Sequence, residues 1–301
     1  MKRTACAILV LALTALAVTG CAPAAPTAPS SPTAPQTPGA TSTPATTPPQ
    51  SSVSPTATAP TTKPVAITVY FEYREKMQSV SRTAPSGTRG VLLAAIKALL
   101  AGPTKKERAA GLGSEIPSGA RLRGVSIADH VATIDLTSRF DSGSGALSMT
   151  NRLAQVVFTA TQFPSVGAVK LSLNGKVVTV FGSEGIMLDH AQTRKDYEDS
   201  TPAIFVDSPG WGGALTEGAL LRGTANVFEA TLRVQLRDSF GTLLFDTTVK
   251  ASSGTGTRGD WTAKVTLNHS TAHTGKLKVW NVSAKNGKPE HVLVIPVLLK
   301  P

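Results

Sequence analysis

Apolar residues alternate with other residues from 67 to 73, which is typical of a half-buried strand, and residues 77–81 predict a second short strand. The period then changes, because apolar residues from Leu92 to Leu100 recur at helical spacing until Gly102-Pro103 ends the run. This change of period predicts an amphipathic helix that packs on a sheet.

A hairpin and a second helix follow along the chain. Apolar alternation on both sides of Asp129-His130 predicts two strands joined by a tight turn. Residues 146–160 place apolar side chains on one helical face, and Phe163-Pro164 ends that helix. Asn174-Gly175 suits the positive φ angles of a two-residue turn between two further strands. Residues 66–200 are therefore predicted to form an α+β domain, a sheet with two helices.

No helical period appears after residue 200. Short apolar alternations separated by turn residues are typical of an immunoglobulin-like sandwich. We expect residues 201–301 to form this all-β domain, with a core held by packing alone because this half has no cysteine. The predicted strands are 203–206, 220–225, 230–236, 242–251, 261–267, 277–282 and 291–299. The candidate core residues are Val234, Phe245, Trp261 and Trp280.

The first residues of the chain predict export. A basic start precedes an uncharged apolar run over 5–18, which is shorter than a spanning helix of about 20 residues and typical of a secretory signal. We predict that residues 1–20 are a signal peptide and that cleavage falls between Gly20 and Cys21. Residues 22–65 are almost entirely Pro, Ala, Thr and Ser, so the segment 21–65 is predicted to be a disordered linker. Its reach is about 40 Å as a coil and about 140 Å if extended.

Cys21 is the candidate lipidation site. The segment Val18-Thr19-Gly20-Cys21 resembles the lipobox of bacterial lipoproteins, in which the thiol receives a diacylglyceryl group and signal peptidase cuts before the Cys. Val18 and Thr19 depart from the commoner Leu and Ala or Ser, and an ordinary signal peptide with an incidental Cys is the alternative. Cys6 leaves with the signal peptide, so Cys21 has no partner for a disulfide. An unpaired thiol in an oxidising compartment favours lipidation.

Charge adds one expectation about partners. The formal charge is +11, and it falls to +9 when Lys2 and Arg3 leave with the signal peptide. The excess is spread evenly, and residues 105–108, the one tight basic cluster, are interrupted by an acid. Nucleic-acid binders concentrate their cations, so we expect a solvated face there and no nucleic-acid partner. The even basicity favours a negatively charged surface such as lipid headgroups or anionic wall polymers.

Several motifs of the first half carry a family resemblance. It resembles the GerMN domain of sporulation and spore-germination proteins over roughly 66–190, although Asp129-His130 departs from the usual Gly-containing turn. The motifs that carry it are 98–104 (ALLAGPT), 114–117 (SEIP) with Gly119, 132–136 (ATIDL), 152–157 (RLAQVV) and 162–166 (QFPSV).

The second half resembles the immunoglobulin-like domain that accompanies GerMN in bacterial lipoproteins, through residues 202–206 with Ser208-Pro209, 223–230 and 254–259. The resemblance implies an envelope lipoprotein of a Gram-positive or related bacterium, with GerMN as an assembly or interaction module. It implies no catalytic residues. Because these domains also occur in bacteria that do not sporulate, it does not by itself assign a role in germination.

Chemistry-bearing residues do not form a recognisable catalytic or metal motif. His269 and His273 have helical spacing but lie in a predicted loop without a third ligand, so no metal and no cofactor are expected. Asp196, Glu198 and Asp199 crowd one segment, and we interpret them as a solvated acidic linker. We interpret the tripeptide 258–260 (RGD) as a turn rather than an adhesive motif. No residue is therefore assigned a catalytic role.

Trp211 is the remaining candidate contact residue. It lies in a Gly-rich loop, residues 208–213, where a large aromatic side chain is costly to leave in water. It is predicted either to cap the end of the sandwich or to contact a partner or glycan.

The predicted function is a non-enzymatic scaffold or interaction protein, attached by lipid to the extracytoplasmic face of the cell membrane and linked to germination, sporulation or wall processes. The partner is predicted to be peptidoglycan, an anionic wall polymer or an envelope protein. One alternative is an accessory lipoprotein of a membrane sensor kinase, and another is a cell-wall hydrolase or its activator.

Overall fold

The computed structural model describes residues 64–84, 90–267 and 272–300. All of them fall in one compact unit, Ala59–Pro301. Gly20, Cys21 and the predicted signal peptide lie outside the described residues, as do residues 21–63 of the predicted linker. In the described ranges, no helix is long and apolar enough to cross a membrane.

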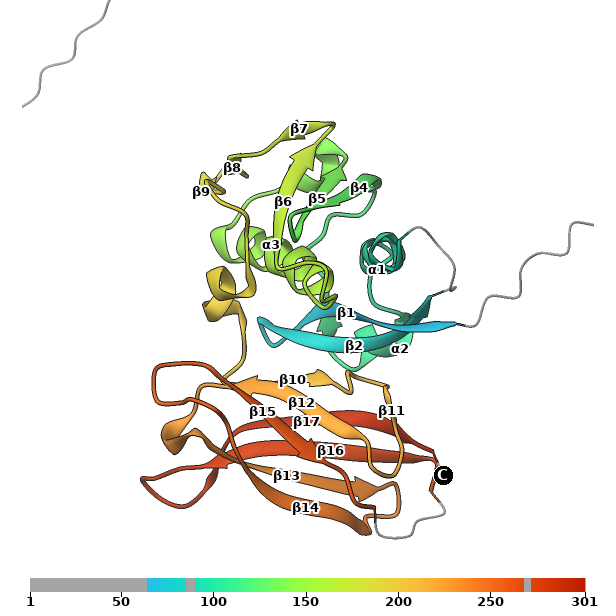
Figure 1. The fold of residues 1–301 in the computed structure, drawn as a ribbon, viewed down its shortest axis with the longest axis vertical. Coiled ribbons are helices and arrows are strands. Elements are labelled where there is room, and N and C mark those ends of the chain that lie inside the picture. The colour runs from blue at the N-terminus through green and yellow to red at the C-terminus, as the bar shows by residue number, and fades with distance from the viewer. Residues whose placement is uncertain (1–63, 85–89, 268–271, 301) are drawn as a thin grey trace, which may run out of the picture. The chain divides into compact units, whose positions relative to one another are not determined.

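The first domain combines helices with several small sheets (Figure 1). Its sheets have the orders β2-β1-β3, β4-β5-β6-β7 and β8-β9. The strands are β1 (Val65–Tyr73), β2 (Lys76–Ala84), β3 (Leu112–Gly113), β4 (Leu122–Ala128), β5 (Val131–Leu136), β6 (Ala168–Leu173), β7 (Lys176–Val177), β8 (Val180–Phe181) and β9 (Ile186–Met187). The helices are α1 (Val91–Leu100), α2 (Lys105–Ala109), α3 (Ala146–Ala160) and the 3₁₀ segments η1 (Ser138–Asp141) and η2 (Arg194–Ser200).

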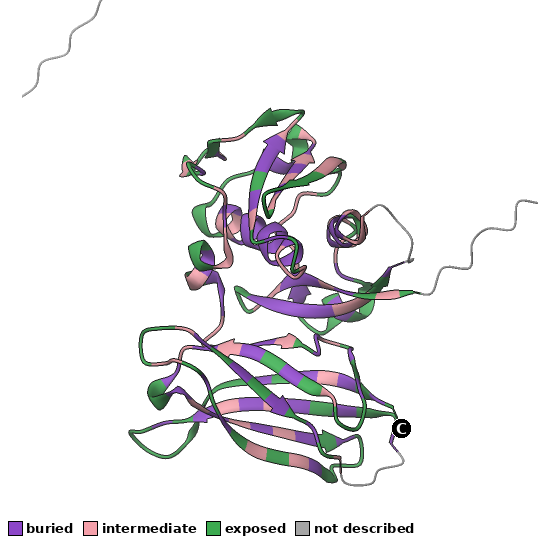
Figure 2. Cartoon of the chain, in the orientation of Figure 1, coloured by how far each residue is buried: buried purple, intermediate pink, exposed green. Residues whose placement is uncertain are grey.

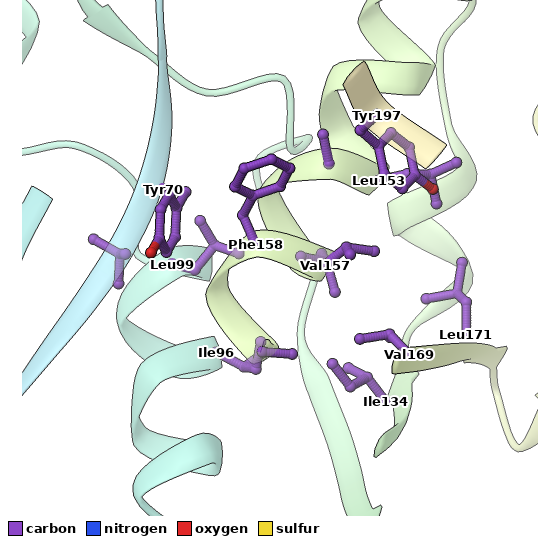
Figure 3. Packing of buried hydrophobic residues seen from close by; sticks show 14 of the residues in the cluster. Tyr70, Ile96, Leu99, Ile134, Leu153, Val157, Phe158, Val169, Leu171 and Tyr197 are labelled. Carbon is purple, nitrogen blue, oxygen red and sulfur yellow. The ribbon is translucent and has the colours of Figure 1, made fainter. Parts of the chain in front are cut away.

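Helix α3 forms the centre of this domain. It connects the parallel strands β5 and β6, and it contacts β1, α1 and η2 as well. From Leu153 to Ala160 every residue is buried, which is typical of a helix enclosed by other elements rather than lying on a surface. Figure 3 shows Phe158 beside Tyr70 on one side of α3, and Val157 near Ile134 and Val169 on another.

Both predicted tight turns of the first domain are confirmed. Asp129 and His130 have φ angles of 49° and 59°, and Asn174 and Gly175 have 50° and 82°. Asn and Gly adopt this left-handed region at low cost, so the turn chemistry fixes where each hairpin reverses.

Helix α2 was not predicted, although the sequence carries its signal. The Thr104 hydroxyl accepts from the Glu107 N–H, and the Glu107 carboxylate accepts from the Thr104 N–H, which together form a capping box. The cluster 105–108 is therefore not only a solvated face. Glu107 is buried and pairs with Arg82 of β2 at 2.5 Å, and Arg82 holds the pKa of Glu107 below its ordinary value although burial acts in the other direction.

The second domain is a sandwich of a three-stranded and a five-stranded sheet. The first has the order β10-β12-β15, with β10 (Ile204–Ser208), β12 (Leu220–Ala225) and β15 (Gly259–Lys264). The second has the order β11-β17-β16-β13-β14, with β11 (Ala214–Leu215), β13 (Thr231–Asp238), β14 (Leu243–Lys250), β16 (Thr274–Val282) and β17 (Pro289–Leu299). A 3₁₀ turn, η3 (Phe228–Ala230), precedes β13. Buried and exposed residues alternate along these strands, as Figure 2 shows.

One of the four candidate core residues was predicted wrongly. Val234 and Trp261 are buried, and Phe245 is half-buried against the core. Trp280 instead lies on the outer face, because Leu277 and Val279 of the same strand point inward and side chains alternate between faces. The aromatic ring of Trp280 therefore lies, partly exposed, on the surface of the sandwich.

Candidate functional site

Trp211, the predicted contact residue, lies between the two domains. Its N–H donates to the Ser79 carbonyl at 2.8 Å, and the Ser81 N–H donates to the Trp211 carbonyl at 3.1 Å, so the loop pairs with β2. The half-buried indole packs against the apolar cores of both domains, with its ring centre 5.8 Å from that of Tyr73. Trp211 therefore joins the domains, and its contact with an external partner stays a prediction.

Two glycines allow the loop of Trp211 to lie flat on β2. A Cβ atom on Gly210 would lie 3.0 Å from backbone atoms of β2, including the Val80 nitrogen. A Cβ atom on Gly213 would lie 2.5 Å from the Ser81 hydroxyl oxygen. Both positions require the absence of a side chain, so the local sequence explains the close approach.

A pocket of about 460 Å³ opens beside Trp211. Lys106 of α2 and Lys276 of β16 line it together with Trp211. Four hydroxyl groups also line it, those of Ser81, Thr104, Ser239 and Thr274. Its polar side chains are hydroxyls and two ammonium groups, and the one carboxylate in the lining, Glu107, is already bound by Arg82.

Arg194 of η2 forms hydrogen bonds with three elements, β1, α3 and β10, where the two domains meet. Its guanidinium donates to the Asp207 carboxylate of β10 at 2.8 Å and to the Tyr70 hydroxyl of β1 at 3.0 Å. It also donates to the Phe158 carbonyl at 3.2 Å and to the Thr161 hydroxyl at 2.9 Å, both at the end of α3. One side chain of η2 therefore binds polar groups of both the first and the second domain.

Aromatic rings surround this cluster. The Arg194 guanidinium lies 5.1 Å from the ring centre of Tyr70 and 4.8 Å from that of Phe158, within cation–π range. Phe205 of β10 stands edge-on to Phe158, with ring centres 5.7 Å apart. Burial raises the pKa of Tyr70 and Asp207 raises it further, so the hydroxyl stays protonated and donates to Asp207 at 2.9 Å. Burial acts to lower the pKa of Arg194, but its interactions with Tyr70 and Asp207 outweigh burial and raise that pKa above its ordinary value.

A second ion pair links η2 to the sandwich. Arg258 donates to the Glu198 carboxylate at 2.8 Å and to the Pro202 carbonyl at 3.0 Å, and its hydrogen bond lowers the pKa of Glu198. The interpretation of Asp196, Glu198 and Asp199 as a solvated linker is therefore wrong for Glu198. In the tripeptide 258–260, Arg258 is committed to this pair and Gly259 is buried, which does not fit an adhesive role.

Two carboxylates in and beside the acidic segment bind the ring nitrogens of His190. Nδ1 of His190 lies 2.7 Å from Asp189, and Nε2 lies 3.2 Å from Asp196. The hydrogen bond to Asp189, followed by that to Asp196, raises the pKa of His190, which favours the imidazolium. With both ring nitrogens engaged by carboxylates, His190 has no free nitrogen to act as a general base.

No metal centre is assembled in the part of the chain that the structure describes, where no three His, Cys, Asp or Glu side chains are placed to hold an ion. His273 is exposed and His269 lies outside the described residues. Sequence reasoning missed Tyr70, Arg194 and Asp207, since an Arg in a polar segment carries no signal of a partner far along the chain.

Family models match both halves of the chain. Residues 68–179 match the Germane model, described as "Sporulation and spore germination". Residues 203–288 match the Gmad2 model, described as "Immunoglobulin-like domain of bacterial spore germination". The two matches occur in the order that the sequence motifs predicted.

Solved structures show limited similarity. The first GerMN domain of the sporulation protein GerM from Bacillus subtilis is 25% identical, with 44% of this chain and 99% of that chain covered and a TM-score of 0.36. The tandem GerMN domains of the same protein are 19% identical, with 62% and 60% covered and a TM-score of 0.36. A chain described as "Putative Lipoprotein from Clostridium perfringens" is 20% identical, with 44% and 89% covered and a TM-score of 0.33. A comparison with curated proteins gave no match. Because these TM-scores are low, the domain identities rest on the family models.

Proposed function

We propose that this chain, which carries a GerMN-type domain followed by the immunoglobulin-like domain of bacterial spore germination, is a lipid-anchored, non-enzymatic adaptor of the bacterial envelope. Cys21 attaches the mature chain to the extracytoplasmic face of the membrane. The segment 21–65 sets the reach, and the two domains together hold a partner.

The interdomain joint is the observation that carries this proposal. Arg194, Trp211 and the Glu198–Arg258 pair all connect the two domains, and Ser79 adds a hydrogen bond of 2.5 Å from its hydroxyl to the Val206 carbonyl. An adaptor needs its binding surfaces in fixed relative positions, since a preorganised surface loses less entropy when it binds. The joint supports that use because it commits buried polar groups to holding the domains together.

The proposed lipid anchor would serve the same function. A single acyl chain binds a membrane only marginally, whereas the two chains of a diacylglyceryl group anchor it stably. Confinement at the membrane raises the effective concentration of the domains near a partner, so a weak contact becomes sufficient.

Crosslinking in intact envelopes tests the proposal. The wild-type chain and the Cys21→Ala variant are expressed with the same tag, labelled with a clickable fatty acid, crosslinked and purified. We expect fatty acid on the wild type alone and a specific envelope partner that is recovered in much lower yield with Cys21→Ala. Absence of label on the wild type refutes the anchor, and equal recovery of the same partner with both chains refutes the need for it.

The same experiment separates the alternatives. Recovery of a sensor kinase identifies the accessory role, and recovery of peptidoglycan alone counts against it. Release of soluble fragments when the purified chain is incubated with walls indicates a hydrolase and overturns the non-enzymatic proposal. If the chain releases no fragments alone but increases the release by a separate, added hydrolase, it is an activator.

A further inference from the structure

The outer face of the five-stranded sheet gathers cations around one tryptophan. Arg233 of β13 lies directly opposite Trp280 of β16, and Arg237 lies directly opposite Lys276. Directly opposite residues of an antiparallel pair share a face. The cations placed on this face by register and alternation are Arg233, Arg237, Lys250, Lys276 and Lys278. Cations that are spread evenly along the sequence are therefore brought together on one face by the fold.

Few acids offset these cations. In the paired registers of the described strands, Asp246 is the one acidic side chain on this face, and it already accepts from Arg233 at 2.6 Å and from Gln235 at 3.0 Å. The ion pairs among the described residues do not include Lys276 or Lys278. The face therefore has an excess of positive charge.

The pairing of β13 with β16 creates a repulsion between like charges that a bound anion would relieve. Arg237 and Lys276 are like charges directly opposite each other, an arrangement that destabilises a sheet. Arg237 is kept in place by a bond of 2.8 Å to the Gly241 carbonyl and one of 3.1 Å to Gln235. An anion between Arg237 and Lys276 would convert this repulsion into two attractions.

Trp280 holds two of the cations in position. The Lys278 ammonium lies 4.7 Å from its ring centre, and the Arg233 guanidinium lies 5.8 Å away. These are cation–π distances, so the ring orders both side chains before any ligand arrives. The Arg233 Nε is buried and has no hydrogen-bond partner among the described residues. A ring covered by cations is poorly suited to insert into lipid, which disfavours a membrane as the ligand.

The geometry suits a linear polyanion. Side chains on one face repeat about every 6.8 Å along a strand and about every 4.8 Å across strands, which produces a flat grid of side chains. This grid carries cations on β13 and β16, and the apolar Val294 and Leu298 of β17 lie beside them. A small molecule prefers an enclosed cavity, whereas a flat grid matches repeated negative groups on an extended chain. At one end the grid meets the pocket of about 460 Å³, because Lys276 lines that pocket together with Lys106 and Trp211.

We propose that this face, centred on Lys276, Lys278 and Trp280, binds a linear phosphate-bearing polymer of the bacterial wall. Phosphate oxygens accept charge-assisted hydrogen bonds from Lys and Arg. The proposal rests on the envelope location proposed above, and it names the ligand of the second domain.

Binding to purified walls tests the face. The probe is bacterial wall that carries a phosphate-bearing polymer, and the same wall after hydrofluoric acid extraction, which cleaves phosphodiesters and leaves peptidoglycan. The protein is the mature chain, residues 21–301, with Cys21→Ala to keep it soluble. The test variant is Lys276→Gln/Lys278→Gln. Its control is Arg222→Gln/Lys264→Gln, which removes the same charge from exposed positions on the three-stranded sheet of the same domain.

We expect binding to intact wall, loss of binding after extraction, and roughly tenfold or more weaker binding for the Lys276/Lys278 variant with the control unchanged. The slope of log affinity against log salt should fall by about 1.4, since two phosphate contacts are lost. Trp280→Leu leaves the charge unchanged and should weaken binding several-fold, while Trp280→Phe should restore most of it. Thermal unfolding of each variant confirms that the fold is retained.

Four outcomes overturn the proposal: equal binding to extracted wall, equal weakening by both double variants, stronger binding to single-stranded nucleic acid, or binding to phosphatidylglycerol vesicles that depends on Lys276 and Lys278. Each leaves the crosslinking test of the anchored adaptor unaffected. The proposed anchor, in turn, is refuted by the absence of the fatty-acid label on the wild type, whatever the result of wall binding.

Discussion

Replacement of Arg194 by Met should destabilise the protein through the interdomain joint. Met keeps the length of the side chain and its apolar contact with Tyr70 and Phe158, and it removes the positive charge and all donors. Asp207 then retains the Tyr70 hydroxyl, at 2.9 Å, as its one remaining side-chain partner of this cluster. The perturbation therefore isolates the polar part of the joint.

The expected cost follows from the burial of the pair. Loss of one partner from a fully buried ion pair costs about 3–5 kcal/mol, and exposed pairs contribute about 0–1 kcal/mol. The side chains of Arg194 and Asp207 are 28% and 26% exposed, between these limits. We expect Arg194→Met to lower the free energy of unfolding by about 2–4 kcal/mol.

Urea unfolding of the mature chain, followed by tryptophan fluorescence, measures this loss. Trp211 lies at the joint, and Trp261 and Trp280 lie in the second domain, so the emission reports loss of the joint and unfolding of the second domain together. The control is Arg123→Met, because Arg123 pairs with Asp135 but is 50% exposed, and its loss should cost under about 1 kcal/mol. Equal, small losses in both variants would refute the assignment of Arg194 to the joint. An Asp207→Asn variant completes a double-mutant cycle, in which a coupling below about 0.5 kcal/mol would refute it as well.

Two further predictions concern the cores of the domains. Burial, and then Glu115, raises the pKa of Glu72 to about 6, so the ionised form is disfavoured in the folded state and stability falls as pH rises from about 4.5 to about 6. Glu72→Gln should therefore gain stability relative to wild type across that window in urea titrations at several pH values, and a difference that does not change with pH would contradict this. Gly223→Ala should lower the free energy of unfolding by about 3 kcal/mol or more, because the new Cβ would lie 2.0 Å from the Phe205 carbonyl oxygen. The control Gly124→Ala should change it by less than about 0.5 kcal/mol, because no atom lies within 4 Å of that Cβ position. Similar melting temperatures for the two alanine variants would contradict this prediction.

Local patterns in the sequence predicted the longer strands and helices of this protein. The alternation at 67–73 corresponds to β1, the helical spacing at 92–100 to α1, and the Asn174-Gly175 pair to a turn with positive φ. Each of these signals depends on neighbours a few residues away. The fold class follows from them, because it needs only the order of helices and strands.

The interdomain joint could not be predicted in the same way. Tyr70 occupies a polar position of an amphipathic strand, and 124 residues separate it from Arg194. Nothing in the local pattern distinguishes Arg194 from Lys195, its exposed neighbour. Only the arrangement of β1, α3 and β10 in space makes one of them a half-buried cation with partners in both domains.

The basic face shows a related limit. Trp280 was predicted to be a core residue, but the alternation with Leu277 and Val279 places it on the outer face. The cations of this face are two or four residues apart on separate strands, so a charge count along the chain appears even. The sheet register converts that even distribution into a patch.

The position of the joint on β1 determines how the protein responds to mechanical load. Val65 begins β1, so a pull from the preceding segment enters the fold along this strand. Strand β1 is paired with β2 over the register from Val65–Ala84 to Tyr73–Lys76, and a pull along its axis loads all of those hydrogen bonds at once. Tyr70, near the far end of β1, passes the force to Arg194 and Asp207. The unfolding rate under tension therefore depends on the β1–β2 ladder and on the joint together, and the second domain remains packed against the first until one of them yields.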